Sequence, residues 1–160
     1  MRDANDQTIE AVEEEFQLSK FTPYRTAVVA QLLSEALARE YRDRFGISIP
    51  DWRVLVHLTA EDGASVRDIE QKVVMEKSKV SRAAARLVER GLLSRIKNET
   101  DGRLVHLSLT PKGKDLMDEL LPLAATFQQR IEVVLGADFA NFERSLSSLW
   151  KEFEASRDAE

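Results

Sequence analysis

The stretch SVRDIEQKVVMEKSKVSRAAARLVERGLLSRIKNETDGRLVHLSLTPKG, residues 65–113, determines the fold of the chain. Apolar residues recur at helical spacing over residues 65–73 and again over about 77–90, with a short turn between the two segments. Two arms of alternating apolar and polar residues follow, and the Asp101-Gly102 pair between them is typical of a hairpin turn. Two short helices with a hairpin directly after them predict a winged helix-turn-helix.

The polar face of the second helix is basic. Ser78, Arg82 and Arg86 are spaced at i, i+4 and i+8, so they lie in one row, and Lys79 and Ser81 flank that row. An α-helix fits the DNA major groove, where arginine donates two hydrogen bonds to guanine and serine or lysine reaches phosphates and base edges. The row therefore favours DNA binding. The alternative is a solvated basic face on an ordinary amphipathic helix.

The tip of the predicted hairpin also carries charge. Arg103 follows the Asp101-Gly102 turn. A hairpin beside a groove-reading helix lies over the phosphate backbone and the neighbouring minor groove, where an inserted arginine meets concentrated negative potential. Asp101 is two residues from Arg103 and is placed to orient it by a charge-assisted bond. We therefore interpret the hairpin tip as a second contact with DNA.

The distribution of charge supports this interpretation better than the total does. The whole chain has a net charge of −5, but residues 65–103 hold ten Lys or Arg and six Asp or Glu, a local charge of +4. The remaining chain must then carry −9. A basic middle between acidic ends is the footprint expected of a nucleic-acid partner.

Composition excludes several classes of function. The 160 residues contain no cysteine, which removes disulfides, thiol nucleophiles and thiolate metal sites. The two histidines, His57 and His106, fall on separate predicted elements and make a poor zinc site. No nucleophile elbow or phosphate-binding glycine loop is present. We expect neither an enzyme nor a cofactor or metal. The acidic N-terminus and the lack of a long apolar run predict a cytoplasmic protein with no membrane span.

Helix-start signals mark four of the predicted helices. Thr22-Pro23 and Thr110-Pro111 each predict a capping threonine followed by proline in the first turn. Ser48 with Asp51, and Ser65 with Asp68, match the spacing of a capping box with aspartate in place of the usual Glu or Gln. Gly46 is predicted to close the first long helix.

The final predicted helix, about residues 138–156, carries an aromatic-rich apolar stripe. Its members are Phe139, Phe142, Leu146, Leu149, Trp150 and Phe153. One interpretation is packing against the first helix of the same chain. The other, favoured because both chain ends lie outside the helix-turn-helix, is a two-fold interface between copies. Such a dimer would place two recognition helices about 34–36 Å apart on DNA.

These patterns predict a mainly α protein with a small β-hairpin wing, in which dimerisation helices flank a winged helix-turn-helix. We expect a mobile acidic N-terminus over residues 1–20. The dimerisation helices are predicted over 21–47 and 111–160, and the DNA-binding lobe over 48–110, hereafter the winged unit.

The chain resembles the MarR family of transcriptional regulators from about residue 21 to residue 153. The segments that carry the resemblance are VSR…LVERGLLSR at the end of the predicted recognition helix, DGR at the wing tip, and LSLTPKG at the junction with the next helix. By this resemblance Ser78, Lys79, Ser81, Arg82 and Arg86 would contact the major groove and Arg103 the minor groove. The chain departs from the family at Glu76-Lys77, where no Ser, Thr, Asp or Asn starts the recognition helix.

The resemblance further implies a homodimer on a pseudo-palindromic operator of double-stranded DNA, released by a small aromatic or anionic ligand. Such a ligand would bind between the dimerisation helices and the winged unit. Residues there that offer stacking, a carboxylate partner or hydrogen bonds are Tyr24, Arg25, Ser34, Trp52 and His57. The favoured alternative for Trp52 is a packed core residue, and for His57 a packed or surface histidine.

We therefore predict a sequence-specific transcriptional regulator, a repressor in preference to an activator. The alternative is a winged helix that binds protein and has no specific DNA site. A regulator that responds only to its own concentration, without an effector, also stays open. The sequence identifies neither the operator nor the effector.

Overall fold

The computed structural model describes residues 17–60, 63–73, 75–97 and 105–157. Most of the N-terminus predicted to be mobile lies outside these residues, as do Asp101 and Arg103 of the predicted wing tip. The elements in chain order are η1 (Leu18–Lys20), α2 (Thr22–Phe45), α3 (Ile49–Ala60), β1 (Ala64–Ser65), α4 (Val66–Val73), α5 (Lys77–Glu89), β2 (Leu93–Lys97), β3 (Val105–Leu109), α6 (Pro111–Leu135), η2 (Gly136–Asp138) and α7 (Phe139–Arg157). The predicted mainly α fold with a small wing is confirmed.

The sheet contains a strand that the sequence pattern does not predict. The predicted hairpin is present as the antiparallel pair β2 and β3, with Leu93 opposite Leu109. The short strand β1 adds to the other edge of β3 and places Ser65 opposite His106. Its two residues are too few to show a period of two in the sequence. The wing is thereby attached to the start of α4.

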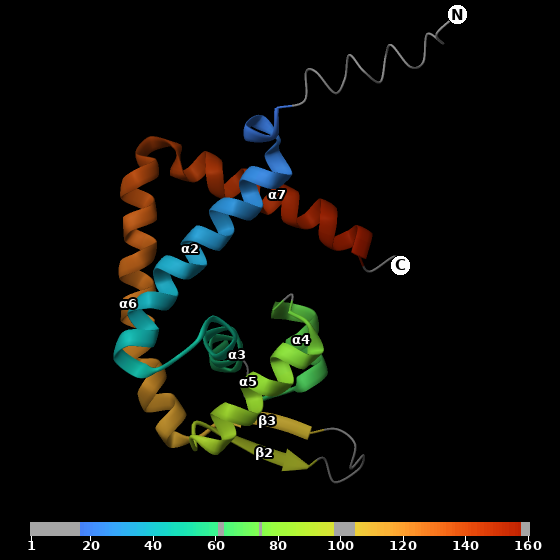
Figure 1. Ribbon diagram of the computed structural model, residues 1–160, viewed down its shortest axis with the longest axis vertical. Helices are drawn as coiled ribbons and strands as arrows, with labels where there is room; N and C mark the ends of the chain where they lie inside the picture. Colours follow the sequence, from blue (N-terminus) through green and yellow to red (C-terminus); the bar gives the residue numbers. More distant parts are fainter. Residues whose placement is uncertain (1–16, 61–62, 74, 98–104, 158–160) are drawn as a thin grey trace, which may run out of the picture.

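The core lies inside the winged unit, where α3, α4 and α5 pack beside the sheet (Figure 1). The inner face of α5 supplies small and branched side chains, as its apolar spacing predicts. Val80, Ala83, Ala84 and Leu87 are all buried. Met117 and Leu120 of α6 join the same core, so the first half of α6 is fixed to the winged unit. The opposite face of α5 is consequently held outward.

Three of the four predicted helix starts are confirmed. The capping boxes of Ser48 with Asp51 and of Ser65 with Asp68 begin α3 and α4. The hydroxyl oxygen of Thr110 accepts a hydrogen bond from the backbone N–H of Gly113 at 3.0 Å. The cap predicted at Thr22 is wrong, because α2 follows a 3-10 turn directly. Phe21 ends that turn by donating its N–H to the Leu18 carbonyl, so Thr22 is already helical.

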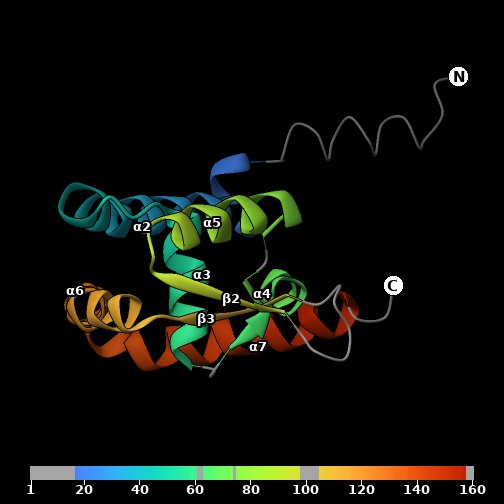
Figure 2. The same cartoon turned by 90° about the horizontal axis from the view of Figure 1, so that it is seen from below.

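The long helices α2 and α6 extend away from the winged unit, and α7 begins at the far end of α6 (Figure 1). The ribbons of α2 and α7 cross in that view, but Figure 2 places them in separate layers. Much of their apolar surface is uncovered within one chain. Within the described ranges, no helix has the length and apolar character needed to cross a membrane.

Candidate nucleic-acid interface

Helix α5 begins without a side-chain cap, as its sequence indicates. Glu76 precedes the helix in an extended conformation, and no described side chain caps this end. Its carbonyl accepts the N–H groups of Lys79 and Val80, at 2.8 and 3.1 Å. Its carboxylate lies 3.7 Å from the Lys79 ammonium. The first turn is therefore closed by backbone bonds, and its serines and lysines stay at the surface.

All five predicted contact residues on α5 are exposed, and they share the side opposite the core. They are Ser78, Lys79, Ser81, Arg82 and Arg86. The Arg82 guanidinium donates to the Ser78 hydroxyl at 3.4 Å, which confirms that these two residues lie on one face, a turn apart. A helix with one buried side and one basic exposed side has the shape and charge that a major groove accepts.

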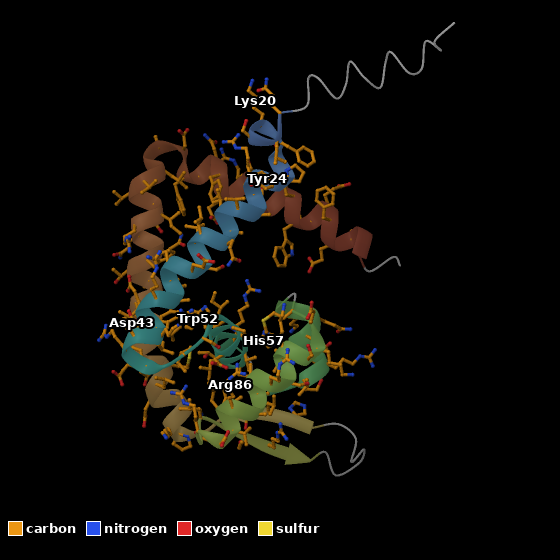
Figure 3. The ribbon with its side chains drawn as sticks, viewed as in Figure 1. Lys20, Tyr24, Asp43, Trp52, His57 and Arg86 are labelled. Carbon is orange, nitrogen blue, oxygen red and sulfur yellow. The ribbon has the colours of Figure 1, made fainter. Side chains whose placement is uncertain are left out.

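Arg86 differs from the other members of the row. Its Nη2 donates to Oδ1 of Asp51 at 2.8 Å, in an ion pair that joins α5 to the first turn of α3. The Asp51 side chain is 5% exposed, whereas that of Arg86 is 47% exposed. Figure 3 shows Arg86 beside α3. The carboxylate thus holds one end of the Arg86 guanidinium against the protein.

The sequence pattern predicts no contact for Arg90, which the structure places at the end of α5. Its guanidinium donates to the carbonyls of Phe45 and Gly46 at 2.8 and 3.0 Å, at the C-terminal end of α2. The carbonyl of Arg90 in turn accepts from the Lys112 ammonium at 2.9 Å. Backbone carbonyls as partners leave no pattern in the side-chain sequence, so these contacts could not have been predicted.

The strands of the wing carry further polar groups. Arg95 on β2 is exposed, and the hydroxyls of Ser94 and Ser108 lie 2.8 Å apart across the β2–β3 pair. Asp101 and Arg103, predicted to act at the wing tip, lie outside the described residues. Their proposed pairing and groove contact therefore stay predictions.

The candidate ligand residues do not form one cluster within the chain. Trp52 and His57 lie on α3 and are partly buried, whereas Tyr24 is at the far end of α2 and is 47% exposed (Figure 3). Arg25, also exposed, adjoins Tyr24. Ten residues of helix, about 15 Å, separate Tyr24 from Ser34.

A tyrosine absent from the predicted set lies beside Trp52. The ring centroids of Tyr41 and Trp52 are 4.6 Å apart. The Tyr41 hydroxyl is buried and has no hydrogen-bond partner among the described residues. Burial raises the pKa of Tyr41 to about 12, with a smaller contribution from the charge of Glu40. At neutral pH the Tyr41 phenol is therefore uncharged and keeps its proton.

The predicted dimerisation stripe is exposed over most of its length. Phe139 and Phe142 are partly buried near the start of α7. Beyond them the exposed fractions are 39% for Leu146, 46% for Leu149, 58% for Trp150 and 67% for Phe153. Because α2 and α7 lie in separate layers, the alternative of packing against the first helix does not account for this stripe (Figure 2).

The sequence and the fold match those of known regulators. A family model described as "MarR family" matches residues 45–104. The chain is 30% identical over 108 residues to the HTH-type transcriptional regulator FarR of Neisseria gonorrhoeae, covering 65% of this chain and 73% of that protein. It is 35% identical over 77 residues to the HTH-type transcriptional regulator Hpr of Exiguobacterium sibiricum. That match covers 48% of this chain and 41% of Hpr, so it spans less than half of the relative.

Among solved structures, the MarR family transcriptional regulator SPO1453 of Silicibacter pomeroyi superposes with a TM-score of 0.75. It is 25% identical in sequence, and the match covers 87% of this chain and 99% of the other. The similarity therefore includes the long helices as well as the winged unit.

Proposed function

The chain belongs to the MarR family of winged helix-turn-helix transcriptional regulators, and we propose that it is a homodimeric repressor controlled by a small ligand. Its family makes it a DNA-binding regulator of transcription and not an enzyme, as the sequence analysis expected. The repressor role, the dimer, the pseudo-palindromic operator and the aromatic or anionic ligand form the proposal.

The exposed face of α5 carries the proposal for DNA recognition. Ser78, Lys79, Ser81 and Arg82 project from a helix whose inner side is fixed in the core. We propose that Arg82 contacts base edges and that Lys79 and the serines reach phosphates or bases. Arg86 shares this face and was predicted as a fifth contact. Arg103, at the tip, is proposed from the sequence to enter the minor groove.

The apolar stripe of α7 and the start of α2 support the dimer. Leu18, Phe21 and Tyr24 at the start of the described chain are each 44–49% exposed. Val133 and Val134, where α6 ends, are 81% and 83% exposed. Exposed apolar surface of this extent is typical of a protein interface. A second copy covering it would be an isologous partner, and its winged unit would supply the second recognition helix.

Ligand control is proposed at the junction of α2 and α3. Trp52 offers an aromatic face there, and Ser34 and His57 are polar and partly buried. Tyr24 and Arg25 lie too far along α2 to share a site with Trp52 in one subunit, so we place the ligand on the Trp52 side. A ligand that prefers the wrong spacing of the winged units would lower operator affinity by its differential affinity for the two states.

The test begins with selection of a preferred duplex from a random DNA library by the wild-type protein. Fluorescence anisotropy then compares the selected duplex with a scrambled one at about 50 and 200 mM salt, a range over which phosphate-dominated binding falls steeply. We expect Arg82→Ala to lose about 1–3 kcal/mol on the selected duplex and to relax base preference.

Arg39→Ala serves as the control, because Arg39 is exposed on α2 outside the winged unit. Weak and equal binding of both duplexes by the wild-type protein would refute the proposal and favour a winged helix whose partner is a protein. Once specific binding is established, release of the duplex by aromatic carboxylic acids tests the ligand class.

A further inference from the structure

The basic residues of the recognition helix fall into two groups by what they contact. Lys79 and Arg82, in its first half, make contacts only to residues of the same turn among the described partners. Arg86 contacts α3 and Arg90 contacts the end of α2, across 35 and 44 residues of chain. The basic side chains at the end of α5 therefore contact other helices, whereas those in its first half face solvent.

Both oxygens of the Asp51 carboxylate accept hydrogen bonds. Its Oδ2 accepts from the backbone N–H and the hydroxyl of Ser48, at 3.1 and 2.5 Å, and its Oδ1 accepts from Arg86. A buried carboxylate that loses one charged partner leaves an acceptor without its bond. If the Arg86 guanidinium moved away to bind a phosphate or a guanine, Asp51 would lose this bond and the folded protein would be less stable.

Arg90 connects the C-terminal ends of α5 and α2. Gly46 ends α2 in the left-handed conformation, with φ of 63°, and leaves carbonyls of the last turn pointing outward. These carbonyls form the negative end of the helix dipole, which a cation stabilises. The guanidinium of Arg90 meets two of them. The end of α5 is thereby attached to the end of α2.

We propose that Arg86 and Arg90 are positioning residues, which fix the orientation of α5 against α3 and α2 and do not contact DNA. The inference rests on the proposed function and deepens it, since it reassigns Arg86 from the predicted set of contacts. It also gives α2 a direct connection to DNA recognition. A shift of α2, which carries exposed apolar surface at its other end, is transmitted to α5 through Arg90.

The test compares Arg86→Gln and Arg90→Gln with two variants on the exposed face of α5. Lys79→Gln removes a proposed phosphate contact, and Arg82→Gln removes a proposed base contact. The probe is the duplex selected by the wild-type protein, with its scrambled version as reference. Each lost phosphate contact reduces the slope of log affinity against log salt by about 0.9. We expect Lys79→Gln to reduce this slope and Arg82→Gln to relax the preference for one base pair. Arg86→Gln and Arg90→Gln should weaken binding of the selected duplex about tenfold with an unchanged slope, because their effect is on geometry.

A second arm tests whether Arg86 acts through Asp51. In an Asp51→Asn background the carboxylate partner is absent, so adding Arg86→Gln should cause no further loss of affinity. An equal loss in both backgrounds, or a reduced salt slope for Arg86→Gln, would show a direct DNA contact and overturn the inference. If Asp51→Asn does not fold, the salt slopes and the base preferences of the single variants decide the question, because a lost base contact relaxes the preference at one base pair.

The outcomes for the two proposals are distinguishable. A wild-type protein that selects no preferred sequence refutes the proposed function, and this inference with it. A wild-type protein that selects a sequence, combined with a reduced slope for Arg86→Gln, refutes the inference alone and returns Arg86 to the set of DNA contacts.

Discussion

The starts of α3 and α4 use the same capping box. In each, the carboxylate oxygen Oδ2 of the aspartate accepts from the backbone N–H and the hydroxyl of the serine. These distances are 3.1 and 2.5 Å for Ser48 with Asp51, and 3.0 and 2.6 Å for Ser65 with Asp68. The serine hydroxyl accepts from the aspartate N–H at 3.3 and 3.1 Å respectively. Locally the two boxes are alike.

Their surroundings differ. Asp51 is 4% exposed and its second oxygen accepts a hydrogen bond from Arg86 of α5, whereas Asp68 is exposed. The hydrogen bonds from Ser65 lower the pKa of Asp68, with smaller contributions from the charges of His106 and Lys72. A local motif of four residues thus fixes a helix start, while burial decides whether the same carboxylate also contacts distant elements.

The largest effect is expected for Asp51→Ala. This change removes the cap of α3 and the partner of Arg86, and a charge-assisted bond of this kind contributes about 1.5–3 kcal/mol. Because Arg86 is half exposed and hydrates when released, we expect a total loss of about 2–3 kcal/mol. Urea unfolding at one fixed protein concentration measures it. A loss no larger than that of Asp68→Ala would remove the distinction between the two boxes.

A smaller effect is expected for Asp68→Ala. The change removes the same local bonds at the start of α4, together with a negative charge at a helix N-terminus, but Asp68 is exposed where Asp51 is buried. The expected cost is about 0.5–1 kcal/mol. The same urea titration measures it, and specific DNA affinity should be unaltered. A loss as large as that of Asp51→Ala would mean that β1 and α4 depend on this carboxylate more than its exposure indicates.

The smallest effect is a pH dependence of stability. Because the pKa of Asp68 is lowered in the folded protein from its ordinary 3.8, its stabilising contribution is present above that value. The contribution is lost as the pH falls through the folded pKa. Between about pH 5 and pH 2, the wild-type protein should therefore lose slightly more unfolding free energy than Asp68→Asn, which does not titrate. Parallel pH profiles for the two proteins would contradict this assignment.

The fold was predictable wherever its cause is local. The apolar spacing of α5, the two capping boxes, Gly46 after α2 and Thr110 before α6 all lie within a few residues of the structure they determine. The error at Thr22 has the same origin. Its threonine-proline pair fits a cap, but the 3-10 turn before it occupies the capping position.

For the candidate site, the sequence predicted which residues share the exposed face of α5, but not which of them contact other helices. The spacing of Arg82 and Arg86 correctly predicted that they share one face of α5. It could not predict that Arg86 contacts Asp51 on α3. The Asp51 partner lies 35 residues away in sequence and is brought to Arg86 only by packing. Arg90 binds backbone carbonyls, and β1 has two residues, so neither leaves a periodic pattern. Long-range contacts of this kind require the structure.

The two tryptophans provide a spectroscopic consequence. Trp52 packs on Tyr41 beside the core, whereas Trp150 is 58% exposed on α7 with its indole N–H donated to Glu154 at 2.7 Å. Their emission maxima should therefore differ, with Trp52 at the shorter wavelength. In Trp52→Phe the remaining emission reports on α7, and in Trp150→Phe it reports on the junction of α2 and α3. The winged unit and the long helices thus each contain a native fluorophore, and the proposed association and ligand binding can be followed separately without a dye.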